Sequence, residues 1–235
     1  MRLKNWKIYL VLVASTFGCW SCAGEGGSSR SRIMVEDVDG NHYRTVRVGE
    51  QLWMAENLRT TRLKDGSPLS HVEDYDSWVD LESAAYCWYN NDSLHAADYG
   101  ALYNYQAIES GKLCPEGWHV PGDEEWTALE LAFTADGNPG GALKEAGTAH
   151  WKTPNTAASD ESGFTALPAG YRSYNGTFNL IRISGFWWTS SPKSFYGSEN
   201  TVLYRGLNYD SGAIERNVAS LNNGFSVRCV KDQAE

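Results

Sequence analysis

Three consecutive acidic residues are the part of this sequence that most resembles a catalytic or metal-binding cluster. Asp123, Glu124 and Glu125 come directly before Trp126 in the segment LCPEGWHVPGDEEW, residues 113–126. Carboxylates gathered in this way can act as general acids or as metal ligands. They also suit the first turn of a helix, where acidic side chains complement the exposed backbone amides and the helix dipole. We favour the helix start, because capping accounts for all three residues without a ligand.

Other catalytic and metal-binding patterns are missing from the sequence. No two histidines have the HExxH spacing of a zinc site, and neither a Gly-x-Ser-x-Gly motif nor a phosphate-binding glycine loop occurs. Asp37, Asp39 and Asn41 imitate the start of a calcium loop, but Val48 stands where that loop needs a bidentate glutamate. A turn is the better interpretation. We therefore predict no metal, no cofactor and no catalytic residue, and we do not expect an enzyme.

The five cysteines suggest different roles by their positions. Cys19 and Cys22 lie near the amino terminus, which leaves Cys87, Cys114 and Cys229 for the rest of the chain. In an oxidising compartment we expect Cys114 and Cys229 to form a disulfide. On the chain-entropy model, a loop of this length stabilises the fold by about 4–5 kcal/mol. Cys87 lies in the apolar run AAYCWYN and is predicted to be a buried free thiol.

The first 21 residues are typical of a lipoprotein signal peptide. Residues 1–7 are basic and residues 8–17 are apolar, a run too short to span a bilayer, which takes about 20 residues. A small residue precedes each of the two cysteines, as in a bacterial lipobox, where the cysteine is acylated and becomes the first residue. We choose Cys22 as the lipidation site, with Cys19 as its rival. Acyl chains contribute about 0.8 kcal/mol per buried methylene, which would hold the chain on a membrane.

Composition divides the rest of the chain into a linker and one domain. Residues 22–32 are rich in glycine and serine and are predicted to be a flexible tether. Residues 33–235 contain no second linker and are predicted to form a single domain. The formal net charge of −9 becomes more negative without the basic signal, so nucleic acid is not an expected partner. We expect an outer membrane lipoprotein of the cell envelope, with its leaflet and oligomeric state left open.

Turn residues and apolar spacing predict a domain of short elements. Asp39-Gly40 and Asn175-Gly176 each separate two alternating runs, which predicts two hairpins. The spacing of apolar residues in residues 98–110 predicts one helix. A second helix is predicted from Asp123 onward, and residues 140–147 suggest a short third one. The final third is predicted to consist of strands and turns.

An ordered series of motifs resembles a known family. The motifs are DVDGNHYRTVRVGEQLWMAENLRTT, YCWYNND, YGALYNYQAI, LCPEGWHVPGDEEWTAL, SGFTALPAGYR, FWWTSS and FSVRCVKD. Together they resemble the Fibrobacter succinogenes major paralogous domain, which is found in envelope lipoproteins of Bacteroidetes. The resemblance covers roughly residues 33–232.

The resemblance implies a fold. Members of that family are similar to the C-type-lectin-like fold and, more distantly, to the formylglycine-generating sulfatase-modifying enzymes. This implies an α+β fold in which two main helices pack on a twisted antiparallel sheet with long irregular loops. It also implies a cysteine near a helix that is linked to one in the final strand, in agreement with the pair predicted above.

The activities of the related proteins do not transfer. The formylglycine-generating enzymes hold copper with two cysteines near the carboxy terminus, and only Cys229 lies there in this chain. Calcium-dependent lectins need Glu-Pro-Asn or Gln-Pro-Asp together with Trp-Asn-Asp. Neither tripeptide pattern occurs, and Asn222-Asn223 offers only neutral oxygens.

Aromatic residues are the remaining candidates for a binding site. The chain has 10 tryptophans and 13 tyrosines, and aromatic rings stack on sugar faces and anchor protein interfaces. Because neighbours on a strand point to opposite faces, we expect one ring of the Trp187-Trp188 pair to be exposed. The same aromatics can instead form the core and surface of a small sheet domain. The candidate ligand-binding residues are Trp187, Trp188, Tyr171, Arg172, Tyr204 and Arg205.

Three functions follow from these observations. The first is a lipid-anchored module at the cell surface or outer membrane that recognises a glycan or a protein without catalysis. The second is a structural or assembly component of the envelope, such as an adhesin or a fimbria-like accessory subunit without a small ligand. An enzyme of unknown reaction ranks third. In addition, Asp92-Ser93-Leu94 resembles the short O-glycosylation signal of Bacteroidetes envelope proteins, which makes Ser93 a candidate glycosylation site.

Overall fold

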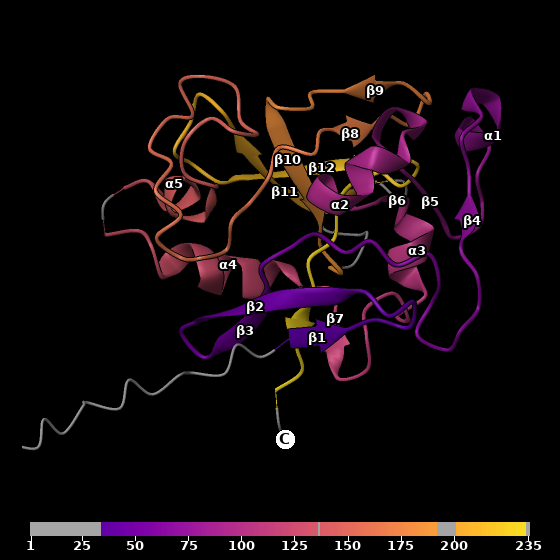
Figure 1. Cartoon of the computed structure of the whole chain (residues 1–235), viewed down its shortest axis with the longest axis horizontal. Helices are drawn as coiled ribbons and strands as arrows, with labels where there is room; N and C mark the ends of the chain where they lie inside the picture. Colours follow the sequence, from indigo (N-terminus) through magenta and orange to yellow (C-terminus); the bar gives the residue numbers. More distant parts are fainter. Residues whose placement is uncertain (1–33, 136, 192–200, 234–235) are drawn as a thin grey trace, which may run out of the picture. The chain divides into compact units, whose positions relative to one another are not determined.

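Short β-strands supply most of the regular structure in residues 34–135, 137–191 and 201–233, the residues that this computed structural model describes (Figure 1). These residues all belong to the unit Arg32–Glu235. Helices are few and short. The α+β class predicted from the sequence is confirmed.

The predictions for the amino terminus fall on residues that the structure does not describe. These are the signal peptide, residues 1–21, the tether, residues 22–32, and the lipidation cysteines Cys19 and Cys22. Among the described residues, no helix has the length and apolar character that crossing a membrane requires.

The strands of the described residues form four sheets, most of them antiparallel. The largest has the order β1-β2-β3-β13-β7, and two three-stranded sheets have the orders β10-β11-β12 and β4-β5-β6, while β8 pairs with β9. Only β4 and β5 pair in parallel among the named strands. The bounds are β1 (Met34–Glu36), β2 (His42–Val48), β3 (Gln51–Met54), β4 (Ser70–His71), β5 (Ala85–Cys87), β6 (Leu102–Tyr103), β7 (Trp118–His119), β8 (Tyr171–Arg172), β9 (Phe178–Asn179), β10 (Ser184–Trp188), β11 (Thr201–Asn208), β12 (Glu215–Ser220) and β13 (Val230–Lys231).

The helices differ from the predicted pair of main helices. The longest helix within the described residues is α4, with nine residues, and its start at Asp123 was predicted. The helix predicted over residues 98–110 is interrupted, because Gly100 has φ +73° and β6 follows it. The α-helices are α1 (Tyr75–Val79), α2 (Ala96–Tyr99), α3 (Tyr105–Glu109), α4 (Asp123–Leu131) and α5 (Pro139–Leu143), and the 3-10 helices are η1 (Tyr89–Asn91) and η2 (Ser93–His95).

Both predicted hairpins are confirmed. Gly40 has φ +80° between β1 and β2, and Gly176 has φ +84° between β8 and β9, in the backbone region that favours glycine. In the first turn, Asp37 accepts hydrogen bonds from the backbone amide of Asn41 at 2.9 Å and from the hydroxyl of Tyr43 at 2.5 Å. The carboxylate that imitated a calcium ligand therefore holds the turn together.

The carboxy-terminal segment passes through the middle of the domain. Gly224 and Phe225 form bridges to Arg172 and Tyr103, and Val230 then pairs with β3 on one side and with β7 on the other. Because one segment pairs with strands from every third of the described chain, it connects sheets that are distant in sequence.

Two cores meet at β10. On one side Trp187 packs with Trp53 of β3 and Trp126 of α4 in one buried cluster. On the other side Trp188 packs with Phe225 in a second cluster. The tryptophans are thus the large units of the core, and every described tryptophan except Trp88 is buried.

Three buried cations hold the long irregular loops together. Lys144 donates to the carbonyl oxygens of residues 156, 208 and 211 at 2.8–3.0 Å. Arg228 donates to the carbonyls of Phe164 and Thr165 and lies over the Phe164 ring. Arg172 acts in the same way on the loop before α1. A buried carbonyl without a partner destabilises a fold, so these side chains replace the hydrogen bonds that a sheet would provide.

A candidate binding groove between two tyrosines

Two of the predicted ligand-binding residues come together in one groove. Tyr171 of β8 and Tyr204 of β11 are both half-buried and line a groove of about 190 Å³. The binding pockets of drug-sized ligands measure roughly 300–1,000 Å³, so this groove suits a single ring or side chain. The other residues used below that line it are Leu180, Phe186, Asn223 and Phe225.

Four aromatic rings give the groove the shape of a trough. Phe186 and Phe225 stack with 5.4 Å between centroids and 24° between planes, and they form the floor. Tyr171 stands on edge to Phe186 at 5.3 Å and 78°, and Tyr204 stands on edge to Phe225 at 5.1 Å and 67°. The two tyrosines are therefore walls on either side of the two phenylalanines, and Phe225 also packs against Trp188, with 4.4 Å between ring centroids.

Strand register explains this arrangement. Phe186 of β10, Gly206 of β11 and Glu215 of β12 are direct neighbours across the sheet. Gly206 leaves room for the carboxylate of Glu215, because a Cβ at this position would lie 3.2 Å from Glu215 Oε2 and 3.3 Å from Phe186 Cδ1. An acidic group thus lies beside the aromatic floor.

Asn223 adds a hydrogen-bonding group to the groove. Asn223 is 8% exposed, and its Oδ1 accepts a hydrogen bond from the backbone amide of Tyr174 at 2.7 Å. Within the described part of the chain, its amide nitrogen has no hydrogen-bond partner. This nitrogen can donate to a hydroxyl or carbonyl oxygen of a ligand.

The hydroxyl of Tyr204 is in its neutral form. Burial raises the pKa of Tyr204, and Glu215 and Tyr171 raise it further. This hydroxyl therefore stays protonated at neutral pH and can donate or accept hydrogen bonds. Aromatic faces, hydroxyls and an amide are suited to binding through stacking and hydrogen bonds.

The prediction of an exposed ring at Trp187 or Trp188 is wrong. Both residues are 0% exposed, because β10 has a packed cluster on each of its faces. Trp187 donates its indole proton to Asn57 at 2.9 Å, and Trp188 donates to the Tyr103 carbonyl at 2.7 Å. These two rings belong to the core and cannot contact a ligand at the surface.

Arg172 is also a structural residue and not a ligand contact. It is 1% exposed and donates to the carbonyls of Val72, Glu73 and Asp74 at 2.6–3.0 Å. Its guanidinium lies 4.4 Å from the Trp78 ring centroid. The contacts of its guanidinium are with backbone carbonyls and aromatic rings of the same domain.

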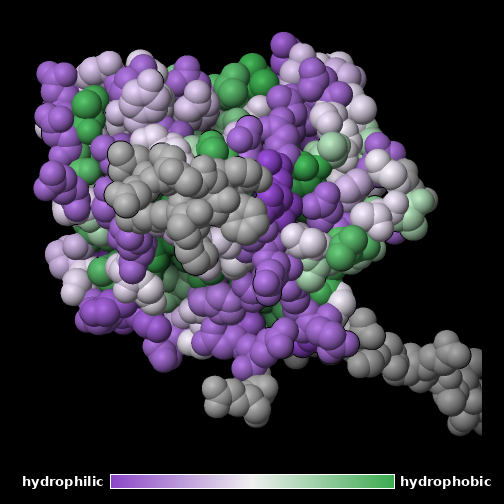
Figure 2. All heavy atoms as spheres, turned by 180° about the vertical axis from the view of Figure 1, so that it is seen from behind, coloured by the Kyte–Doolittle hydropathy of each residue, from purple (hydrophilic) through white to green (hydrophobic). Residues whose placement is uncertain are grey.

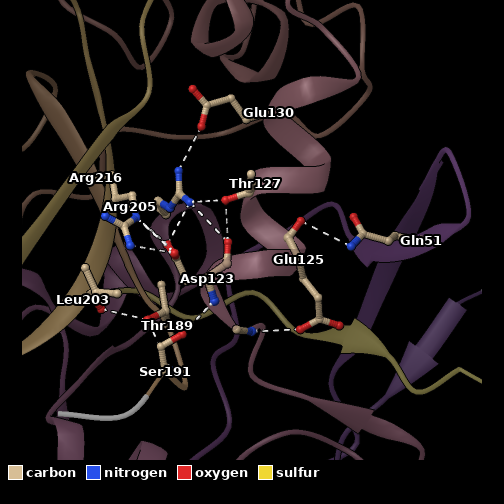
Figure 3. A network of polar contacts seen from close by, with 11 residues as sticks. Gln51, Asp123, Glu125, Thr127, Glu130, Thr189, Ser191, Leu203, Arg205 and Arg216 are labelled. Carbon is tan, nitrogen blue, oxygen red and sulfur yellow. Dashed lines mark hydrogen bonds and ion pairs between the residues drawn. The ribbon is translucent and has the colours of Figure 1, made fainter. Parts of the chain in front are cut away.

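Arg205 points away from the groove toward α4, although it follows Tyr204 directly (Figure 3). Strand alternation places these neighbours on opposite faces. Arg205 is 1% exposed and contacts Asp123 Oδ1 at 2.8 Å and Glu130 at 2.9 Å. Arg216 of β12 approaches the same Asp123 at 2.9 Å. The predicted role of Arg205 in ligand binding is replaced by an ion-pair network.

The acidic cluster at the start of α4 divides its work among its members. Asp123 forms the ion pairs with β11 and β12, whereas Glu125 accepts the backbone amide of Gly122 at 2.8 Å, as expected of a helix start. Gly122 has no capping side chain, and the hydroxyl of Ser191 accepts the Asp123 amide at 2.8 Å instead (Figure 3). The structural interpretation of this cluster accounts for these contacts.

His119 lies between two carboxylates. Its Nδ1 is 2.6 Å from Asp232 and its Nε2 is 2.9 Å from Glu125. Hydrogen bonding to Glu125 and then to Asp232 raises the pKa of His119 to about 9. Because both ring nitrogens already have partners, the side chain links β7, α4 and the carboxy terminus. The described residues contain no group of three or more potential metal ligands.

The remaining predicted residues take the expected places where the structure describes them. Cys114 and Cys229 form a disulfide with Cα atoms 6.0 Å apart. Cys87 is a buried free thiol, and burial raises its pKa to about 12. Ser93 is exposed at the start of η2, and its glycosylation stays a prediction.

The groove contains six residues that sequence analysis missed: Leu180, Phe186, Val218, Ala219, Asn223 and Phe225. Phe186 and Phe225 lie in segments that were predicted to be strands, but their contact depends on the pairing of these segments. Asn223 was considered only as a calcium ligand.

Figure 2 shows the molecule from behind. Hydrophilic side chains cover most of the surface in this view, and apolar side chains lie in small separate groups.

Comparison with known proteins identifies one family. The model of a family described as the Fibrobacter succinogenes major domain matches residues 46–231. No curated protein and no solved structure matches the chain.

Proposed function

The chain belongs to the Fibrobacter succinogenes major domain family, and from this premise we propose that it is a non-catalytic binding module of the cell envelope. It is anchored by a lipid at Cys22 and located at the outer membrane. It recognises a glycan through the groove between Tyr171 and Tyr204. Its architecture is a variant of the C-type-lectin-like fold that works without calcium.

The trough of four aromatic rings is the observation that carries this proposal. The half-buried rings of Tyr171 and Tyr204 offer apolar surface to a sugar ring, and the phenylalanines beneath them, Phe186 and Phe225, are 8% and 3% exposed. The hydroxyls of the wall tyrosines and the free amide nitrogen of Asn223 supply hydrogen bonds at the rim. The size of the groove, about 190 Å³, favours one sugar unit over a large ligand.

Membrane anchoring rests on the amino-terminal sequence. A basic region, an apolar run and a cysteine after a small residue together favour an acylated lipoprotein. The intact mass of the native protein tests this part, because maturation at Cys22 cleaves off the first 21 residues and adds the mass of the acyl chains. Acyl chains on Cys19 would move the anchor to the rival site, and a chain without acyl groups on either cysteine would reject the anchor.

A glycan array with the purified full-length chain tests the groove. We expect wild type to bind a set of neutral glycans and Tyr204→Ala and Tyr171→Ala to lose this binding, because each removes a wall of the trough. Tyr204→Phe keeps the ring and loses only the hydroxyl, so it should weaken binding less. Leu131→Ala is the matched control, since Leu131 is 63% exposed at the end of α4.

Two results would contradict the proposal. If the wild-type protein binds no glycan, the proposed glycan-binding function is rejected. If the variants bind as tightly as wild type, the groove is rejected as the binding site. Near-ultraviolet circular dichroism of each variant shows whether the aromatic packing persists, so a loss of binding is not confused with unfolding.

A further inference from the structure

A second groove, of about 450 Å³, lies between two loops and carries two positively charged side chains. Both loops belong to the irregular part of the chain between α5 and β10. The residues of interest are Thr148, Lys152 and Thr153 from one loop and Ile181, Arg182 and Ile183 from the other.

The backbone brings the two cations side by side. The amide of Lys152 donates to the carbonyl oxygen of Arg182 at 2.7 Å, which joins loops that are distant in sequence. Leu180 and Arg182 both have left-handed backbone, with φ of +64° and +66°. Non-glycine residues adopt this conformation only where the surrounding structure holds them. The segment therefore directs Leu180 into the aromatic groove and Arg182 into this one.

Both cations are held in position without a counter-ion. Arg182 Nη1 donates to the carbonyl of Ala149 at 3.2 Å, and Lys152 Nζ lies 4.8 Å from the centroid of the Tyr209 ring. Neither side chain forms an ion pair with any residue that the structure describes. Some other exposed cations have such partners, such as Lys112 with Asp65 at 2.8 Å, whereas Arg47 and Lys231 likewise have none among the described residues.

This groove therefore presents two positive charges to solvent on a chain with a formal net charge of −9. A guanidinium matches the oxygen geometry of carboxylates and sulfates, and an ammonium adds a second charge. The hydroxyls of Thr148 and Thr153 and the side chains of Ile181 and Ile183 provide polar and apolar contacts around them. We propose that this groove binds the carboxylate or sulfate group of an acidic saccharide.

The two grooves give independent tests, because no residue lines both. The proposal has two halves. The anionic half, that the ligand group is negatively charged, rests on Lys152 and Arg182 alone. The saccharide half, that this group belongs to a sugar, rests on the proposed glycan-binding function. Failure of one half can therefore be recognised separately from failure of the other.

Calorimetric titration of the full-length chain tests the proposal with three probes. These are a disaccharide that contains glucuronic acid, its neutral glucose counterpart, and inorganic sulfate. We expect the acidic disaccharide to bind at least about tenfold more tightly than the other two. Lys152→Gln and Arg182→Gln should each weaken it by about 10–100-fold, the range for a charged hydrogen bond. Lys152→Arg should retain binding, and Lys112→Gln is the charge-matched control.

Each alternative result overturns a defined part. Equal affinity for the acidic and neutral disaccharides, unchanged in Arg182→Gln, overturns the anion site. Inorganic sulfate that binds as tightly as the acidic disaccharide overturns the saccharide half. Binding of the acidic disaccharide that is lost in Tyr204→Ala but kept in Arg182→Gln places the ligand in the aromatic groove and rejects this site, while the proposed function survives.

Discussion

Single buried charges fix the position of several chain segments in this protein. Arg205 is the clearest example, because it is 1% exposed and binds Asp123 and Glu130 of α4 from the neighbouring sheet. Asp123 itself stays deprotonated, since Arg216 and Arg205 lower its pKa against the effect of its burial. The ion pairs therefore lock α4 to β11 and β12.

Arg205→Met should destabilise the fold by about 1.5–3 kcal/mol, because Glu130 loses its ion pair and Asp123, which keeps Arg216, loses a charged hydrogen bond. Arg216→Met removes a contact to the same Asp123, but the Arg216 side chain is 30% exposed, so its loss should cost about 1 kcal/mol or less. Urea unfolding followed by tryptophan fluorescence measures both free energies. Equal losses in the two variants would show that burial does not determine the contribution.

At the scale of elements, close backbone packing fixes the segment that separates the two grooves. We call this segment, which carries Leu180 and Arg182, the ridge. Gly170 has φ +64° and lies against the backbone of Asn179 and Ile181. A Cβ on Gly170 would lie 2.4 Å from the Asn179 carbonyl oxygen and 2.6 Å from the Ile181 amide nitrogen. Any side chain here would have to displace the segment that carries Leu180 and Arg182.

Gly170→Ala should therefore destabilise the fold more than its backbone conformation alone requires. Gly147 is the matched control, since it has φ +83° and no atom lies near its missing side chain. We expect Gly147→Ala to cost about 1–2 kcal/mol, the strain of a left-handed alanine, and Gly170→Ala to cost about 1–3 kcal/mol more from overpacking. Urea unfolding measures the free energy that each variant loses. Equal losses would mean that the ridge shifts away from the new side chain without a large loss of stability.

Local chemistry made some elements predictable from the sequence, and tertiary pairing hid others. The turns at Gly40 and Gly176 and the start of α4 follow from neighbouring residues, so they were predicted correctly. Leu102 has helical spacing, but it pairs with Cys87 as part of β6, and no local signal reveals a strand partner. The same limit applies to the site, since strand alternation cannot show that both faces of β10 are covered.

At the scale of the whole molecule, the segment from Gly224 to Lys231 connects the sheets, and the disulfide secures it. Cys229 precedes β13, which lies between β3 and β7, and Cys114 lies in the loop before β7. The bond closes a loop of sequence separation 115. That loop contains α4, the ridge between the two grooves and the sheet β10-β11-β12. Closing it limits the unfolded chain over more than half of the described residues.

Cys114→Ser combined with Cys229→Ser should lower the free energy of unfolding by about 5 kcal/mol, the entropy of a loop of this length. Because Cys87 is unpaired but packs in an apolar cluster, Cys87→Ser should respond to a reductant as wild type does, while its buried hydroxyl lowers the denaturant midpoint equally with and without reductant. The double variant should not respond to the reductant at all. Denaturant titrations of the three proteins with and without dithiothreitol measure these differences. If the double variant were as stable as oxidised wild type, noncovalent pairing of β13 with β3 and β7 would suffice to hold the carboxy-terminal segment in place.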